Sequence, residues 1–224
     1  MSRSTLSALD TSLYPQIWGQ QTVIDPQNLL MALLTGDIEI DPKEFTKLLL
    51  KDTVYQEWIN ATVFGRYIQR SFTAFYRQTE DSFNMDMPAL FRRELMRHAQ
   101  FLPIAQTLFV AGDIPKSARL DKLFTTTVNP ATALDDAQKI SQNAVKSGRL
   151  LSQEIIINKI KVAGKQIVGF PIRHNKRTSE RTRNEVLILD FNDLRLVSEE
   201  VVEASAIKKS NTAETILLRY YELR

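Results

Sequence analysis

The sequence predicts an α+β fold, in which an N-terminal helical lobe packs on a mainly antiparallel β-sheet. In the first half of the 224 residues, apolar side chains recur at helical spacing, whereas the second half contains a series of short β-branched runs. Helices that precede strands in this way are typical of α+β proteins. We therefore expect a helical lobe over residues 1–103 and a β-rich core over residues 104–224, packed together as one compact unit.

Four segments of the first half are expected to be helical. Asp25-Pro26 and Asp41-Pro42 each introduce an apolar run, because the Asp can cap a helix whose first turn accommodates the Pro. Between Tyr55 and Tyr76, apolar residues recur three and four positions apart, as on one face of a long helix. Residues 87–102 have a similar pattern and predict another helix.

The second half is expected to form strands, with one helix among them. Residues with high β propensity cluster in runs that are separated by turn-forming or charged segments. The helix is predicted from Pro130 to about Val145. The predicted strands are residues 106–111, 123–128, 153–162, 165–170, 185–190, 194–199 and 214–223.

Composition excludes several classes of protein. The 29 basic and 26 acidic residues give a net charge of only +3, so any attraction to an anionic partner has to be local. The absence of cysteine excludes disulfides and thiol catalysis. Since no apolar run approaches the roughly 20 residues of a membrane-spanning helix and the N-terminus lacks a signal-peptide pattern, we expect a soluble, cytoplasmic protein without a membrane association.

Common cofactor motifs are missing. The seven glycines form no GxGxxG pattern, and Ala163-Gly164-Lys165 lacks the remaining residues of a phosphate-binding loop. His98 and His174 are far apart in the sequence, which disfavours a histidine-based metal site or a Ser-His triad. We expect no metal cofactor.

A set of short motifs occurs in a characteristic order in the second half. Leu123-Phe124 is followed by the hydroxyl-rich Thr125-Thr126-Thr127, and then by a Pro and an Ala in Val128–Ala133. Later come Glu185-Val186-Leu187-Ile188-Leu189, Leu194–Ser198 and a final strand pattern at residues 214–223. In this order, residues 104–223 resemble the mono-ADP-ribosyltransferases, particularly the arginine–serine–glutamate group of bacterial toxins and T4-like phages.

This resemblance implies an ADP-ribosyltransferase-like fold and an enzyme that takes NAD as its substrate and modifies a protein. Glu185 would be the catalytic carboxylate, which stabilises the oxocarbenium-like charge on the ribose. Thr125 would orient Glu185 by a hydrogen bond, and Thr125, Thr126 and Thr127 would contact the nicotinamide ribose. Gly112 would permit a close approach of NAD to the backbone, because it has no side chain.

Two positions depart from the pattern of this family. Ala111 stands where the family has an NAD-binding arginine, and it cannot supply a guanidinium. Arg183 stands at the substrate-recognition position two residues before Glu185, where the family has Glu or Gln. A cation at that position would repel an arginine acceptor. The missing positive contact with NAD could come from Arg119, Arg149 or Arg173, among which the sequence does not choose.

Less specific interpretations stay open. Threonines are favoured in strands by β-branching alone, and a Glu at a strand start is usually a solvated residue. The basic segment 173–183 reads as a solvated loop, or else as a surface that docks an acidic protein or, with weaker support, nucleic acid. The principal hypothesis is an NAD-dependent ADP-ribosyltransferase-like protein that modifies a protein acceptor, in the host cytoplasm if it is a phage factor. The alternatives are a catalytically inactive binding module of the same fold and an unrelated α+β nucleic-acid-binding or virion protein.

Overall fold

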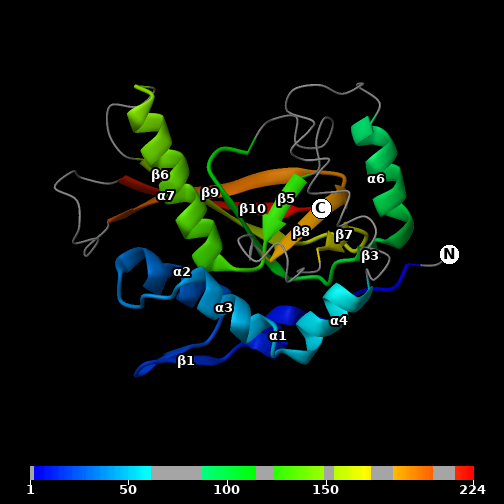
Figure 1. The fold of residues 1–224 in the computed structure, drawn as a ribbon, viewed down its shortest axis with the longest axis horizontal. Helices are drawn as coiled ribbons and strands as arrows, with labels where there is room; N and C mark the ends of the chain where they lie inside the picture. Colours follow the sequence, from blue (N-terminus) through cyan, green and yellow to red (C-terminus); the bar gives the residue numbers. More distant parts are fainter. Residues whose placement is uncertain (1–2, 62–86, 115–123, 149–153, 173–183, 204–214) are drawn as a thin grey trace.

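An eight-stranded sheet with helices around it forms the protein, which confirms the predicted α+β class and the mainly antiparallel pairing. The computed structural model describes residues 3–61, 87–114, 124–148, 154–172, 184–203 and 215–224 (Figure 1). The strand order in the sheet is β3-β7-β8-β5-β4-β6-β10-β9. Its strands are β3 (Gln100–Phe101), β4 (Thr107–Ala111), β5 (Phe124–Thr127), β6 (Glu154–Val162), β7 (Val168–Pro171), β8 (Glu185–Asp190), β9 (Leu194–Glu203) and β10 (Thr215–Leu223).

Every predicted strand run contains an observed strand, in keeping with the β-branched and aliphatic residues in these runs. The strand pairs are antiparallel except β6 and β10, which run parallel from Glu154 opposite Thr215 to Val162 opposite Leu223. The strand order is not the order of the sequence. In particular, β5 lies between β4 and β8, although β6 and β7 intervene in the chain.

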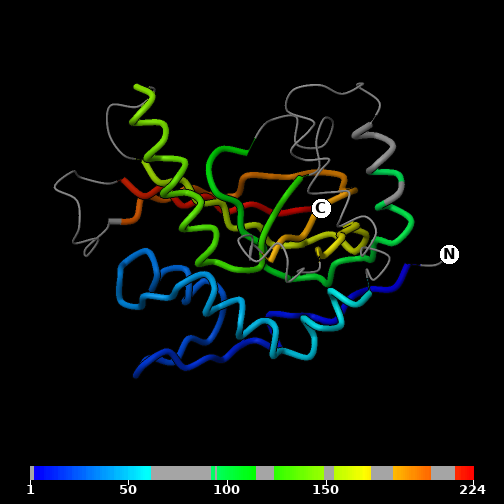
Figure 2. Tube along the Cα trace, viewed as in Figure 1, coloured from blue at the N-terminus to red at the C-terminus, as the bar shows by residue number. Residues whose placement is uncertain are grey.

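The N-terminal helices lie together on one side of the sheet (Figures 1 and 2). They are α1 (Leu9–Leu13), α2 (Pro26–Thr35), α3 (Pro42–Leu49) and α4 (Thr53–Ala61). Both Asp-Pro starts are confirmed, since Asp25 accepts a hydrogen bond from the Asn28 amide at 2.8 Å and Asp41 accepts one from the Lys43 amide at 2.7 Å. The predicted helix from Tyr55 to Tyr76 begins as α4, and its continuation beyond residue 61 lies outside the described residues.

Four short elements of the N-terminal half are not apparent from the sequence pattern. Helix α1 has only five residues, and β1 (Gln16–Trp18) pairs with β2 (Gln21–Val23) as a small separate hairpin. The fourth is β3, which corrects the predicted helix over residues 87–102. Helix α6 (Met87–His98) ends earlier, because Phe101 pairs with Val168 of β7 and exchanges backbone hydrogen bonds with the N-terminal segment.

Clusters of buried side chains join the two halves of the chain. The first combines Leu9, Phe45 and Trp58 of the N-terminal helices with sheet residues such as Leu108 and Ile188. A second cluster joins α2 and α7 (Pro130–Lys146) to β4, β6 and β10, and a third lies beneath α6. None of the helices that the structure describes combines the length and the apolar character needed to span a membrane.

Candidate functional site

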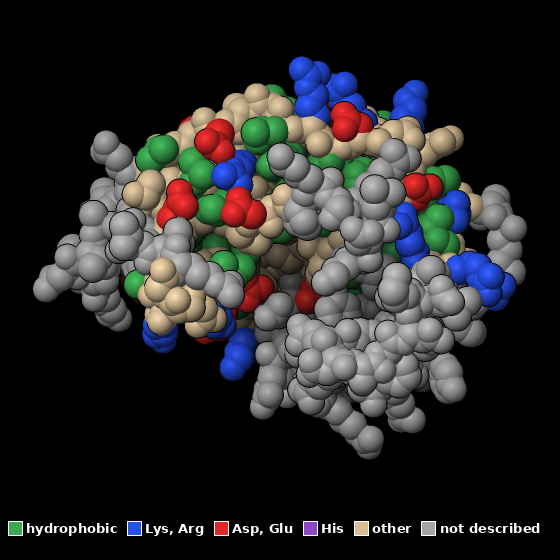
Figure 3. All heavy atoms as spheres, turned by 90° about the horizontal axis from the view of Figure 1, so that it is seen from above, with side chains coloured by type: hydrophobic (Ala, Val, Ile, Leu, Met, Phe, Trp, Pro, Cys, Tyr) green, Lys and Arg blue, Asp and Glu red, His purple; other side chains and the backbone are tan. Residues whose placement is uncertain are grey.

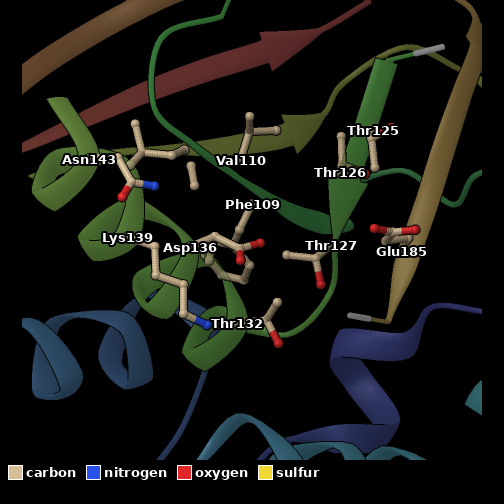
Figure 4. A pocket seen from close by; sticks show the side chains of 13 residues that line it. Phe109, Val110, Thr125, Thr126, Thr127, Thr132, Asp136, Lys139, Asn143 and Glu185 are labelled. Atoms are coloured by element: carbon tan, nitrogen blue, oxygen red, sulfur yellow. The ribbon is translucent and has the colours of Figure 1, made fainter. Parts of the chain in front are cut away.

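A pocket of about 450 Å³ lies between helix α7 and the adjoining strands β4, β5 and β8 (Figure 4). Seen from above, this face of the molecule is hollowed, and acidic side chains lie beside the hollow (Figure 3). The volume falls within the range of small-molecule sites, roughly 300 to 1,000 Å³. The lining residues are Phe109, Val110, Ala111, Thr125, Thr126, Thr127, Thr132, Ala133, Asp136, Lys139, Ile140, Asn143 and Glu185.

The pairing of β5 with β8 brings the predicted threonines and the predicted glutamate to this one pocket. Thr127 lies directly opposite Glu185, and Thr125 lies opposite Leu187. Because alternate residues of a strand share a face, Thr125, Thr127 and Glu185 lie on the same face of the sheet. Thr125 is therefore the diagonal neighbour of Glu185, and Thr127 is its direct neighbour. Both Thr125 and Glu185 are partly buried.

The other two threonines use their hydroxyls to hold β5 against neighbouring backbone. Thr126 lies on the opposite face and donates to the Val186 carbonyl at 2.8 Å. Thr127 donates to the Asn184 carbonyl at 3.3 Å and accepts a hydrogen bond from the Asn129 amide at 3.1 Å. These bonds fix the end of β5 relative to the start of β8. Thr126 and Thr127 thus anchor β5 to the backbone of β8 and of the segment that leads into it.

Glu185 follows a buried asparagine with an unusual backbone conformation. Asn184 is fully buried and has φ of +48°, in the left-handed region that few residues other than Gly, Asn and Asp adopt. Its side-chain oxygen accepts hydrogen bonds from Thr46 of α3 at 2.7 Å and from Asn129 at 3.0 Å. Its Nδ2 donates to the Tyr55 hydroxyl of α4 at 2.9 Å. The N-terminal helices therefore hold Asn184, the residue that directly precedes Glu185.

Asn129 connects the same network to helix α7. Its side-chain oxygen accepts a hydrogen bond from the Thr132 amide at 3.1 Å and so caps the helix. Its Nδ2 also donates to the Pro42 carbonyl at 3.0 Å. This cap confirms the predicted start of the helix at Pro130 and ties both walls of the pocket to one buried set of hydrogen bonds.

The pKa of the Tyr55 hydroxyl depends on the charge of Glu185. Burial raises the pKa of the Tyr55 hydroxyl well above its ordinary value, and the negative charge of Glu185 raises that pKa further. The hydrogen bond from Asn184 opposes this shift, since it favours the phenolate. Tyr55 is thus a neutral hydroxyl at physiological pH, and it lies close enough to Glu185 to respond to its charge.

The β4 wall of the pocket is apolar. Ala111, where the predicted resemblance would have an arginine, lines the pocket. Gly112 follows at the end of β4, is buried and has φ of +74°, which explains the need for glycine there. Gly112 is not a lining residue; a Cβ at this position would lie 3.3 Å from Ile140 Cδ1 of α7. Its expected contact with NAD stays a prediction.

Helix α7 contributes polar pocket residues that the sequence analysis did not identify. Asp136, Lys139 and Asn143 project from one face of the helix (Figure 4). Their spacing of three and four residues places them in one row, and this spacing within the predicted helix 130–145 was the available signal. Lys139 is exposed and forms an ion pair with Asp135 in the preceding turn, so the pocket has a cation at its rim.

Several predicted residues lie outside the described part of the chain. These are Arg183, the basic segment 173–183 that includes His174, and the three arginines considered as phosphate contacts, Arg119, Arg149 and Arg173. Within the described residues, no three His, Asp or Glu side chains are grouped as metal ligands. Comparisons of the chain with models of known protein families, with curated proteins and with solved structures found no significant match.

Proposed function

We propose that the protein is an NAD-dependent mono-ADP-ribosyltransferase-like enzyme that modifies a protein acceptor. The observation that carries this proposal is the meeting of Glu185 and the threonine strand β5 in one pocket. The two motifs are far apart in the sequence, and a structure in which they faced different sides would have removed the basis of the hypothesis. The volume of the pocket is suitable for a small substrate.

In the proposed reaction, the bond between nicotinamide and C1′ of the ribose breaks, and nicotinamide leaves with the bonding electron pair. A nucleophilic side chain of the acceptor bonds to C1′ and releases a proton. Positive charge develops on the ribose during this exchange. The Glu185 carboxylate would stabilise that charge from a backbone position that the hydrogen bonds of the preceding residue, Asn184, hold in place before the reaction.

The threonines would have different roles. Thr127 anchors β5 through its bonds to Asn184 and Asn129, which keeps the direct neighbour of Glu185 in place. Thr125, one pleat farther along the same face, is the better candidate for contact with a ribose hydroxyl or with Glu185. The basic segment 173–183 precedes Glu185 in the chain and would contact an acidic acceptor surface.

Labelled NAD tests the proposal. The purified protein is incubated with NAD labelled in the ADP-ribose part and a cell lysate, and nicotinamide release is measured in parallel. Glu185→Gln should lower both signals by about 100-fold or more, as expected for the loss of a preorganised electrostatic contact. Glu39→Gln is the matched control, because Glu39 is exposed and lies outside the pocket. Absence of both signals in the native protein, or equal signals in Glu185→Gln, would contradict the proposal.

Ala111 favours a second candidate function, a binding module of the same fold without catalysis. The pocket wall at Ala111 offers no guanidinium for NAD. This alternative predicts neither NAD binding nor nicotinamide release, together with retained affinity for an acidic protein partner. Titration with NAD by calorimetry separates the two candidates before an acceptor is known.

A further inference from the structure

A second carboxylate faces the pocket from the wall opposite Glu185. Asp136 lies on the α7 wall, while Glu185 belongs to β8 on the far side of Thr127 (Figure 4). Asp136 is partly buried, and its helix is fixed at the N-terminus by the Asn129 cap. The two acidic side chains therefore come from different elements and are held on either side of one ligand-sized space.

The described lining residues of the pocket carry two carboxylates and one ammonium group. Among the described lining residues, the ionisable side chains are Asp136, Lys139 and Glu185. Lys139 is 63% exposed and its ammonium group is paired with Asp135, which does not line the pocket. Its charge is thus offset by that carboxylate and screened by solvent. The remaining lining side chains are neutral hydroxyls, an amide and apolar groups.

Such a lining is complementary to a ligand that is both hydroxylated and positively charged. Hydroxyls and amides offer hydrogen bonds to a sugar, and carboxylates attract a cation that is close to it. In oxidised NAD, the nicotinamide ring is a pyridinium cation attached directly to ribose. In the reduced dinucleotide the ring is uncharged, although its shape and the rest of the molecule are nearly the same. The diphosphate half of either molecule is anionic and suits this lining poorly.

We propose that Asp136 is a substrate-contacting residue which, together with Glu185, holds the cationic ribosyl-pyridinium half of NAD and selects the oxidised over the reduced dinucleotide. This inference rests on the proposed function, because it takes NAD as the ligand. It assigns a role to a helix residue for which the sequence motifs gave no function. It also gives Glu185 a part in binding as well as in the transition state.

Equilibrium binding tests the role of Asp136. The affinities for NAD and for NADH are measured by calorimetry in the native protein, in Asp136→Asn and in Asp136→Glu. The native protein should prefer NAD, and Asp136→Asn should reduce the ratio of the two affinities about fivefold, as expected for one partly solvated charge pair. Asp136→Glu should retain the preference, since it keeps the charge. The affinity for NADH should change little in either variant.

Asp190→Asn is the matched control. Asp190 is exposed at the other end of β8, about 17 Å from Glu185 along the strand at about 3.4 Å per residue. The substitution makes the same change in charge outside the pocket, so the preference for NAD should stay as in the native protein. Circular dichroism confirms that each variant is folded. An unchanged ratio in folded Asp136→Asn, or an equal loss in Asp190→Asn, would overturn the inference.

The outcomes separate this inference from the proposed function. If the preference for NAD depends on Asp136 but no Glu185-dependent transfer occurs, the inference holds and the enzymatic proposal fails. If Glu185-dependent transfer occurs and the preference is insensitive to Asp136, the inference fails and the enzymatic proposal holds. Failure of both dinucleotides to bind overturns both.

Discussion

Replacement of Asn184 tests whether the buried network fixes the start of β8. In Asn184→Gly the backbone can keep its φ of +48°, but three side-chain hydrogen bonds are lost, to Thr46, Asn129 and Tyr55. In Asn184→Ala the same bonds are lost, and the methyl group is in addition unfavourable in the left-handed region. The two variants therefore separate the side-chain contribution from the backbone contribution.

The expected losses follow from the contacts. Each buried hydrogen bond contributes about 1 kcal/mol net, so Asn184→Gly should lower the free energy of unfolding by about 3 kcal/mol. Asn184→Ala should lower it by about 4 kcal/mol, because a left-handed alanine costs about 1 kcal/mol more. Thr46 and Asn129 can retain the Pro42 carbonyl as an acceptor, at 2.8 and 3.0 Å, whereas Tyr55 loses the donor to its hydroxyl.

Urea unfolding at equilibrium measures these differences. Tyr55→Phe and its combination with Asn184→Gly complete a double-mutant cycle, for which we expect a coupling energy of about 1 kcal/mol between the two residues. Two results would refute the reasoning: losses below about 1 kcal/mol in both Asn184 variants, or equal losses in the Gly and Ala variants. The first would mean that the hydrogen bonds contribute little, and the second that the backbone at Asn184 relaxes without strain.

Three further substitutions test the fold. Burial raises the pKa of Asp10 from 3.8 to about 6. The protonated Asp10 therefore stabilises the fold fully below pH 4, and this contribution is lost as the pH rises through 6. In urea unfolding, the free energy of unfolding of the native protein should fall by up to about 3 kcal/mol relative to Asp10→Asn between pH 4 and 7. Gly169→Ala places a methyl 2.6 Å from Leu102 Cδ2, and thermal denaturation should report a loss of about 1 to 3 kcal/mol; an unchanged Tm would contradict this. Trp58→Phe removes the 2.8 Å bond to the Ser7 carbonyl and leaves a void, for an expected loss of about 2 kcal/mol in urea.

Elements with a strong local signal were predictable from the sequence. The strands at Glu154–Val162 and Glu185–Asp190 consist largely of β-branched and aliphatic residues, and helix α7 begins at a capping Asn followed by Pro. The hairpin β1–β2 and the two-residue strand β3 could not be predicted in this way. They are too short for a period to be recognised, and their pairing partners, rather than their own residues, determine their conformation.

The candidate site was predictable only in part, because local sequence signals identify the strands but not how the strands and helices face one another. Glu185 and the threonines of β5 occur at strand positions, and the motif order suggested that they belong together. Which of the hydroxyls lies opposite the carboxylate depends on strand register, and this places Thr127 rather than Thr125 directly across from Glu185. To predict that Asp136 lines the pocket, one has to know which face of α7 covers the sheet. A helical period alone does not identify the strand that a helix faces.

The parallel pair β6 and β10 has a consequence for the order in which the sheet assembles. Among the described strands, β9 pairs only with β10, while β10 joins β6 on its other side. On the ribosome, β9 therefore emerges without a partner and has to wait for the strand that is synthesised after it. The β9–β10 hairpin then docks as a unit on β6 through contacts that are distant in sequence, and contacts of this kind form slowly. Completion of this side of the sheet should be the late step of folding, and until it occurs the unpaired backbone of β9 is a hazard for aggregation.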